Sequence, residues 1–166
     1  MSTKIFFRIV LWCCVAAIMV AIFMFSNQTA DISSKTSGCV IEKIASVLIA
    51  DYSNMTTQNK QSIISNMQNI VRKTAHFAIY FMLGLFTFSA MLTYTMRNRR
   101  RVLTAAAICL TYAASDEFHQ MFLPGRGPQI LDVCLDFCGS ILGISIVFLI
   151  SYLIIKRTCK TKVGTN

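Results

Sequence analysis

Four long apolar segments limit the folds that this chain can adopt. They cover residues 5–25, 74–95, 102–122 and 130–155. Each reaches the roughly 20 residues that a helix needs to cross the hydrocarbon core of a bilayer. The sequence therefore predicts an all-α fold, an integral membrane bundle of four transmembrane helices.

The composition agrees with residence in a membrane. Of the 166 residues, 55% are hydrophobic and only 14% are charged, and the mean hydropathy is +0.58. A soluble domain of this size would need more polar surface. The first apolar segment is longer than the core of a typical signal peptide, so we interpret it as a retained helix. We expect residues 1–166 to form a single membrane domain.

The distribution of charge predicts the orientation. The N-terminus, the connection between the second and third segments and the C-terminal tail carry ten basic and no acidic residues: Lys4, Arg8, Arg97, Arg99, Arg100, Arg101, Lys156, Arg157, Lys160 and Lys162. All seven acidic residues lie on the other side. The positive-inside rule therefore predicts a multi-pass protein with both termini in the cytoplasm. The net charge of +9 is an orientation signal, with possible anionic-lipid contact. Nucleic acid is excluded as a partner, because no soluble basic face or groove-reading element is present.

The outer connection, residues 26–73, has helical periodicity of its own. Apolar residues recur at helical spacing over residues 40–48 and again over residues 63–71. Two short amphipathic helices on the outer interface would explain this pattern. A loosely packed, solvated loop is the alternative.

Ionisable residues interrupt the outer ends of the last three segments. A charged side chain at the centre of a membrane helix costs about 2.5–3.5 kcal/mol, so such residues usually face one another, water or a ligand. The spacing places several of them on shared helix faces at one depth. We therefore predict an outward-facing ligand site formed by Arg72, Lys73, His76, Tyr80, Asp116, Glu117, His119, Gln120, Arg126, Asp132 and Asp136.

The residue types in this site allow more than one chemistry. His76, His119 and Asp116, with Asp132 or Asp136, could bind a divalent metal. The same five residues are candidates for catalysis, in which a His–Asp pair acts as general base. Two arginines, Arg72 and Arg126, could hold a phosphate group. An interhelical network that only stabilises the bundle is the structural alternative, and transport is a weaker interpretation because four helices without a repeat offer no second gate.

Two glycines predict how the last segment packs. Gly139 and Gly143 form a GxxxG pattern just below Asp136, on nearly the same helix face. Small residues at this spacing allow a second helix to approach closely. The face that carries the acidic residues is therefore expected to pack into the bundle.

Several short motifs resemble the VanZ-like family. They are Arg-Lys-Thr-Ala-His-Phe at 72–77 with Tyr80, Ser-Asp-Glu-Phe-His-Gln at 115–120, Phe-Leu-Pro-Gly-Arg at 122–126, and Asp132, Val133, Asp136 and Gly139 in order. Residues 25–28 and 33–38 resemble its N-terminal signature. Relatives often have a glutamate where this chain has Ile79. This difference weakens any mechanism that needs a further carboxylate on the second helix.

The resemblance implies a small, multi-spanning protein of the bacterial plasma membrane. The family takes its name from a member that gives low-level resistance to the lipoglycopeptide teicoplanin. It implies a function at the cell envelope, with membrane lipids, a lipid-linked cell-wall precursor or the drug itself as candidate partners. Whether the site binds such a molecule or acts on it as an enzyme stays open at this point.

Overall fold

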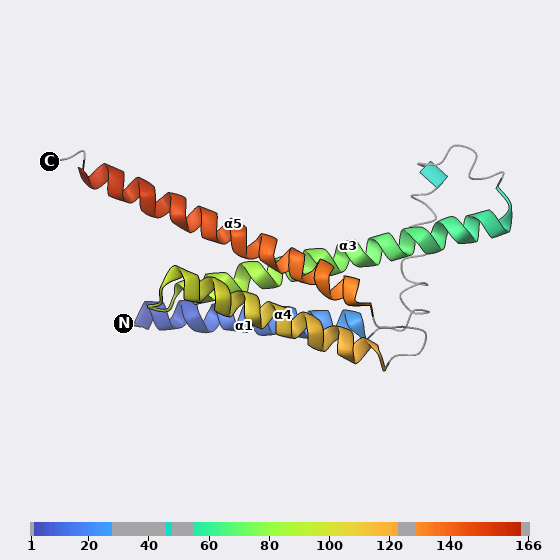
Figure 1. Cartoon of the computed structure of the whole chain (residues 1–166), viewed down its shortest axis with the longest axis horizontal. Coiled ribbons are helices and arrows are strands. Elements are labelled where there is room, and N and C mark those ends of the chain that lie inside the picture. Colours follow the sequence, from blue (N-terminus) through green and yellow to red (C-terminus); the bar gives the residue numbers. More distant parts are fainter. Residues whose placement is uncertain (1, 28–45, 48–54, 123–128, 164–166) are drawn as a thin grey trace.

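The computed structural model describes residues 2–27, 46–47, 55–122 and 129–163. These residues form four long helices: α1 (Ser2–Ser26), α3 (Thr57–Leu92), α4 (Asn98–Gln120) and α5 (Ile130–Val163) (Figure 1). No strand occurs among the residues described, which confirms the all-α class.

Three of these helices are long and apolar enough to cross a membrane. The spans lie in Thr3–Ser26, Thr57–Leu92 and Ile130–Arg157. The α4 helix corresponds to the third predicted segment, and it does not meet the same requirement. The reason is its polar ends: basic residues occupy its first turn, and Asp116, Glu117 and His119 lie near its end. It nevertheless packs against α1, α3 and α5.

The helix boundaries correct one prediction about the outer connection. The α3 helix begins at Thr57 and continues without interruption for 36 residues, so residues 63–71 belong to it and do not form a separate interfacial helix. No proline or glycine occurs between residues 57 and 83 to end the helix. The other interfacial helix, predicted over residues 40–48, lies outside the described residues except for Ser46 and Val47.

Glycines bring α3 and α5 into close contact. A Cβ atom on Gly143 would overlap the backbone carbonyl of Phe81, and one on Gly139 would lie 2.5 Å from the carbonyl oxygen of Phe77. On the facing helix, a Cβ atom on Gly84 would overlap the carbonyl of Ser140. The GxxxG prediction is therefore confirmed, and α3 is the helix that approaches.

A second set of contacts holds the end of the bundle where α3 meets α4. Arg8 of α1 donates hydrogen bonds to Thr93 Oγ1 (3.2 Å) and to the Thr93 carbonyl (2.8 Å), beyond the last residue of α3. Its guanidinium carbon lies 4.0 Å from the centre of the Tyr94 ring. Trp12 Nε1 donates to the Tyr94 hydroxyl at 3.1 Å. The position of Arg8, near the C-terminus of α3 and over an aromatic ring, is favourable for a cation. These contacts hold α1 against α3.

The core fills the space between the helices, and apolar side chains also cover the outside. Buried residues include Val15, Ile22, Leu83, Phe88 and Ile144. Large apolar side chains are exposed along the outer faces of α1 and α5. An exposed apolar surface of this extent suits contact with lipid.

Candidate functional site

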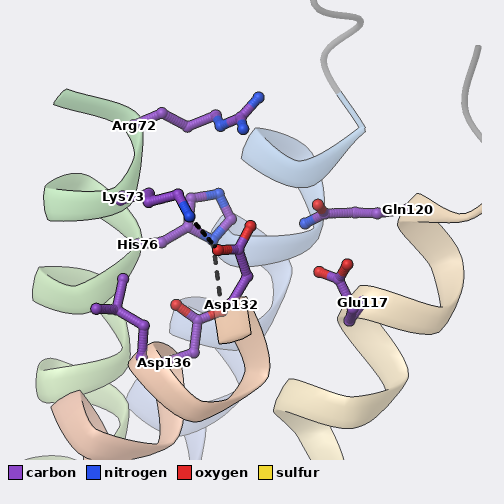
Figure 2. A pocket seen from close by; sticks show the side chains of 8 residues that line it. Arg72, Lys73, His76, Glu117, Gln120, Asp132 and Asp136 are labelled. Carbon is purple, nitrogen blue, oxygen red and sulfur yellow. Dashed lines mark hydrogen bonds and ion pairs between the residues drawn. The ribbon is translucent and has the colours of Figure 1, made fainter. Parts of the chain in front are cut away.

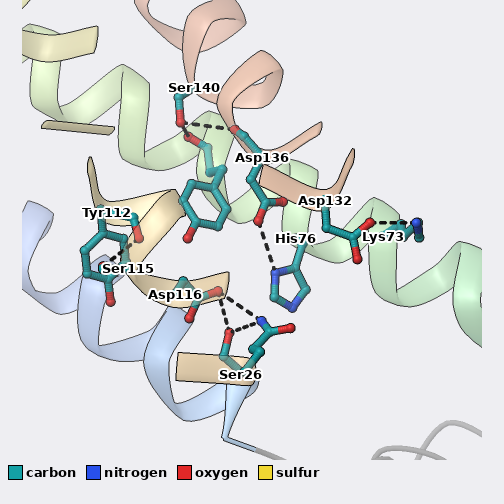
Figure 3. A network of polar contacts seen from close by, with 11 residues as sticks. Ser26, Lys73, His76, Tyr112, Ser115, Asp116, Asp132, Asp136 and Ser140 are labelled. Carbon is teal, nitrogen blue, oxygen red and sulfur yellow. Dashed lines mark hydrogen bonds and ion pairs between the residues drawn. The ribbon is translucent and has the colours of Figure 1, made fainter. Parts of the chain in front are cut away.

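Polar side chains from all four helices meet at the end of the bundle where α1 and α4 end and α5 begins (Figures 1 and 3). Ser26 is the last residue of α1, and His76 lies midway along α3. Asp116 comes from α4, and Asp136 lies in the second turn of α5. The two carboxylates are buried, with 5% of each residue exposed.

Asp116 is held by two side chains. Ser26 Oγ donates a hydrogen bond to Asp116 Oδ2 at 2.7 Å, and Gln120 Nε2 donates to the same oxygen at 3.1 Å. The Gln120 amide also donates to Ser26 Oγ at 3.1 Å. These three residues form a closed triangle between α1 and α4 (Figure 3). The triangle fixes the position of the Asp116 carboxylate.

Asp136 faces His76 across the contact between α3 and α5. His76 Nδ1 lies 3.7 Å from Asp136 Oδ2. The other carboxylate oxygen, Oδ1, is buried and has no hydrogen-bond partner among the described residues, and neither has the buried hydroxyl of Tyr80. Ser140, one turn further along α5, donates hydrogen bonds to the Tyr80 carbonyl at 3.1 Å and the Asp136 carbonyl at 3.2 Å. Ser140 thus links the backbones of α3 and α5 at this point. The side chains of Asp136 and Tyr80 each keep one buried oxygen without a partner in the described structure.

A small pocket opens beside these carboxylates (Figure 2). It is lined by Arg72, Lys73, His76, Glu117, Gln120, Asp132, Leu135 and Asp136. Its inner volume is about 10 Å³, which is room for roughly one water molecule or one ion. Anything larger must lie at its mouth.

The charged residues at the mouth differ in how they are paired. Lys73 Nζ forms a 2.6 Å ion pair with Asp132 Oδ1, and 40% of the Lys73 side chain is exposed. Glu117 Oε1 accepts a hydrogen bond from the backbone nitrogen of Gln129 at 2.7 Å, which joins α4 to the start of α5. The Arg72 guanidinium lies over the pocket in Figure 2 and has no hydrogen-bond or ion-pair partner within the described part of the chain.

One predicted site residue lies elsewhere, and a second falls outside the described residues. His119 packs its ring against Phe23 of α1, with ring centres 4.9 Å apart, and its Nε2 atom is buried without a partner in the described structure. Asp116 and Gln120 reach Ser26 at the end of α1, whereas the ring of His119 lies against Phe23, about one turn earlier on the same helix. Arg126 lies outside the described residues.

The remaining ligands come together. One ligand atom each from His76, Asp116 and Asp136 lies within 4.8 Å of the others. His119 and Asp132 are not part of this group, although the sequence offered both as possible ligands. Sequence reasoning missed Ser26 as a site residue. The sequence feature that could have identified Ser26 is its position as a polar residue directly after the first apolar segment.

Comparison with known proteins adds a family relationship. The model of the VanZ/LLP1 family matches residues 11–151, which is most of the chain. The match includes Ser26, the three grouped ligands and the residues that line the pocket. No curated protein and no solved structure matches the chain.

Proposed function

The chain belongs to the VanZ/LLP1 family, and we propose that it binds the phosphate-bearing headgroup of a cell-envelope lipid or lipid-linked wall precursor at the mouth of the polar pocket. Its family is linked to glycopeptide resistance. In this proposal the bound lipid alters the outward-facing surface of the plasma membrane, which teicoplanin approaches. The cell's tolerance to the drug rises because of this change.

The guanidinium of Arg72, which has no partner among the described residues, carries the proposal. Arginine offers a planar set of donors that matches a phosphate group, and it is costly to hold such a group at a membrane site without a counter-ion. Lys73 is already paired with Asp132. Of the two cations that line the pocket in the described part of the chain, Arg72 is therefore the one available for an anionic ligand.

The surroundings of the pocket favour a lipid as the ligand. Ile70 and Val71 precede Arg72 on α3, and Ile130 and Leu131 precede Asp132 on α5; all four are exposed. An anionic headgroup near Arg72 would therefore lie beside exposed apolar side chains at the membrane interface, which is where lipid headgroups lie. A soluble anion would gain nothing from that surface.

We also propose a multi-pass topology in the bacterial plasma membrane, with both termini in the cytoplasm and the pocket facing outward. The support is the position of the basic residues. The N-terminus, the connection from α3 to α4 and the C-terminal end of α5 lie at the same end of the bundle (Figure 1). The pocket is lined by residues near the end of α4 and the start of α5, which lie at the other end. In this arrangement α4 also crosses the membrane, and its polar ends lie at the two interfaces.

Reporter fusions test this topology. Green fluorescent protein at the C-terminus should fluoresce, and alkaline phosphatase at the same position should be inactive. Alkaline phosphatase inserted after Asn27 should be active. An active phosphatase at the C-terminus would contradict the proposed orientation.

Lipid binding can be measured directly on the purified chain. Native mass spectrometry in detergent should show retention of phosphatidylglycerol over a neutral glycolipid with the same acyl chains. Arg72→Gln should remove this preference. The matched control is Arg100→Gln, which changes an exposed arginine at the opposite end of the bundle. Equal loss in both variants, or no preference in the parent, would rule out a headgroup site at Arg72.

Resistance is tested by expression in a Gram-positive host. The parent chain should raise tolerance to teicoplanin more than tolerance to vancomycin. Arg72→Gln and Asp136→Asn should lose this effect at equal membrane abundance, and Arg100→Gln should keep it. A parent chain that confers no tolerance would remove the link to resistance but leave the lipid-binding result unaffected.

An enzyme that acts on a lipid-linked or cell-wall substrate is the second candidate. The observation that favours it is the buried His76–Asp136 pair, in which a carboxylate faces an imidazole nitrogen at 3.7 Å. Such a pair can serve as a general base beside a bound headgroup. For an enzyme, Asp136→Asn would abolish resistance while retention of phosphatidylglycerol stays unchanged. For a protein that only binds the lipid, the same variant would lose both resistance and retention or would keep both.

A further inference from the structure

We infer that His76, Asp116 and Asp136 bind one divalent metal ion beside the pocket, which His76 and Asp136 help to line. This inference goes beyond the proposed headgroup site, because it does not depend on which lipid binds or on whether Arg72 binds it. The three ligands come from three different helices, α3, α4 and α5. An ion there would join these helices at the level of the outer interface.

The distances between the ligand atoms suit an ion. The three atoms lie within 4.8 Å of one another, and His76 Nδ1 lies 3.7 Å from Asp136 Oδ2. Ligands at bond lengths of about 2.0–2.2 Å lie about 3–4.4 Å apart around a metal, depending on the angle between them. Small side-chain rotations are therefore enough to complete coordination. The adjoining pocket, which His76 and Asp136 line, has an inner volume of about 10 Å³.

Two buried oxygens already lack partners at this position. Asp136 has a side chain that is only 8% exposed, and its Oδ1 atom has no hydrogen-bond partner among the described residues. The hydroxyl of the fully buried Tyr80 also meets no partner with hydrogen-bond geometry among the described residues. A buried polar atom without a partner costs about 1–3 kcal/mol. A cation, with its bound water, would satisfy these oxygens.

The charges in the site are also unbalanced. Two buried carboxylates, Asp116 and Asp136, face one imidazole, and no lysine or arginine within the described ranges forms an ion pair with either of them. Buried carboxylates are usually paired or coordinate a metal. A protonated His76 would neutralise one negative charge, whereas a divalent ion neutralises both. The lysine that lines the same pocket, Lys73, is paired with Asp132 and not with either of these carboxylates.

The Asp116 carboxylate is oriented as metal ligands commonly are. Ser26 and Gln120 both donate to its Oδ2 atom. Hydrogen bonds of this kind hold a ligand in place, and their loss usually lowers metal affinity about 10–100-fold. This role explains why a serine at the end of α1 reaches into the site.

One imidazole and two carboxylates are donors that suit Mn²⁺, Fe²⁺ or Zn²⁺. Mn²⁺ is the better probe, because the seven cysteines of the chain could bind Zn²⁺ adventitiously. The protein is purified in detergent as the full chain with a tag that contains no histidine, treated with EDTA and dialysed against MnCl₂. Bound manganese is then measured by mass spectrometry, and affinity by titration.

We expect one Mn²⁺ per chain in the parent. His76→Ala and Asp136→Asn should each weaken binding by at least about tenfold, as should Ser26→Ala. His119→Ala and Cys134→Ala are the controls, since they remove the other histidine of the chain and an exposed cysteine of α5, both outside the group of three ligands. Both controls should bind as the parent does. No bound Mn²⁺ in the parent, or an equal loss in the controls, overturns the inference.

A stability measurement separates a metal site from a purely structural network. Without metal, Asp116→Asn should unfold at the same temperature as the parent or higher, because it removes one of two facing negative charges. Mn²⁺ should raise the unfolding temperature of the parent and not that of the variant. A variant that is less stable than the metal-free parent, with no effect of Mn²⁺ on either, would assign the three residues a structural role only. Arg72→Gln should leave Mn²⁺ binding intact, so failure of the headgroup site and failure of the metal site can be told apart.

Discussion

Ser26 Oγ donates a 2.7 Å hydrogen bond to Asp116 Oδ2, and this contact joins the last residue of α1 to the buried face of α4 across 90 positions of sequence. The acceptor is a carboxylate, which makes the hydrogen bond stronger than one between neutral groups. It ties the first helix to a site whose other residues all come from the last three.

Removal of this hydroxyl should lower the stability of the bundle. We expect Ser26→Ala to reduce the free energy of unfolding by about 0.5–2 kcal/mol, the range found for hydrogen bonds between membrane helices. The measurement is denaturant unfolding in detergent, followed by circular dichroism. Ser145→Ala is the control, because this exposed serine donates only to the carbonyl of Ile141 in its own helix. If both variants are equally stable, the Ser26 contact contributes nothing.

A methyl group at the α3–α5 contact should separate the two helices. Gly84→Ala and Gly143→Ala each place a Cβ atom against a backbone carbonyl of the facing helix, which cannot move as a flexible side chain does. We expect a loss of about 1–3 kcal/mol in each variant, as for other overpacked sites. Thermal unfolding measures this loss. Cys138→Ala, at an exposed position on α5, should have no such effect.

The same glycine variants should also disturb the site. His76 lies on α3 and Asp136 lies on α5, so a larger separation of these helices increases the distance between the two side chains. Mn²⁺ affinity should fall in Gly84→Ala even in protein that remains folded. Unchanged affinity would mean that the helices adjust around the new methyl group.

The contact between Arg8 and Tyr94 should contribute to stability through the aromatic ring itself. A double-mutant cycle with Arg8→Met and Tyr94→Leu should give a coupling energy of about 0.5–1 kcal/mol, as expected for a partly exposed cation–π pair. Arg8→Lys should recover part of the loss, because a lysine keeps the charge but not the planar set of donors to Thr93. A coupling energy of zero would leave only the hydrogen bonds to Thr93.

His119 should tolerate an apolar replacement. Its ring packs on Phe23, and its Nε2 atom is buried without a partner in the part of the chain that is described. His119→Phe keeps the ring contact and removes the unpaired nitrogen, so stability should stay equal or increase. Thermal unfolding with and without Mn²⁺ tests this. A loss of Mn²⁺ binding in His119→Phe would mean that His119 is a metal ligand after all.

The sequence was sufficient for features that depend on local patterns. Apolar length predicted the helices, and GxxxG spacing predicted a close helix contact at Gly139 and Gly143. The cost of charge in a membrane identified Asp116 and Asp136 as residues that must face a partner. Each of these conclusions follows from periodicity within one segment, which is why one sequence could support them. The continuous α3 helix was missed because apolar spacing alone does not say where one helix ends and the next begins.

Other features depend on the relative rotation and depth of different helices. Both histidines lie at plausible depths, but only packing decides that His76 faces Asp136 while His119 turns toward Phe23. Packing also decides that α3 is the helix that contacts the GxxxG face, and that Ser26 points into the site. The sequence by itself determined an all-α chain with spanning helices and a concentration of ionisable residues at one end. The tertiary structure decided which of those residues meet, because contacts between helices depend on angles and separations that no single segment encodes.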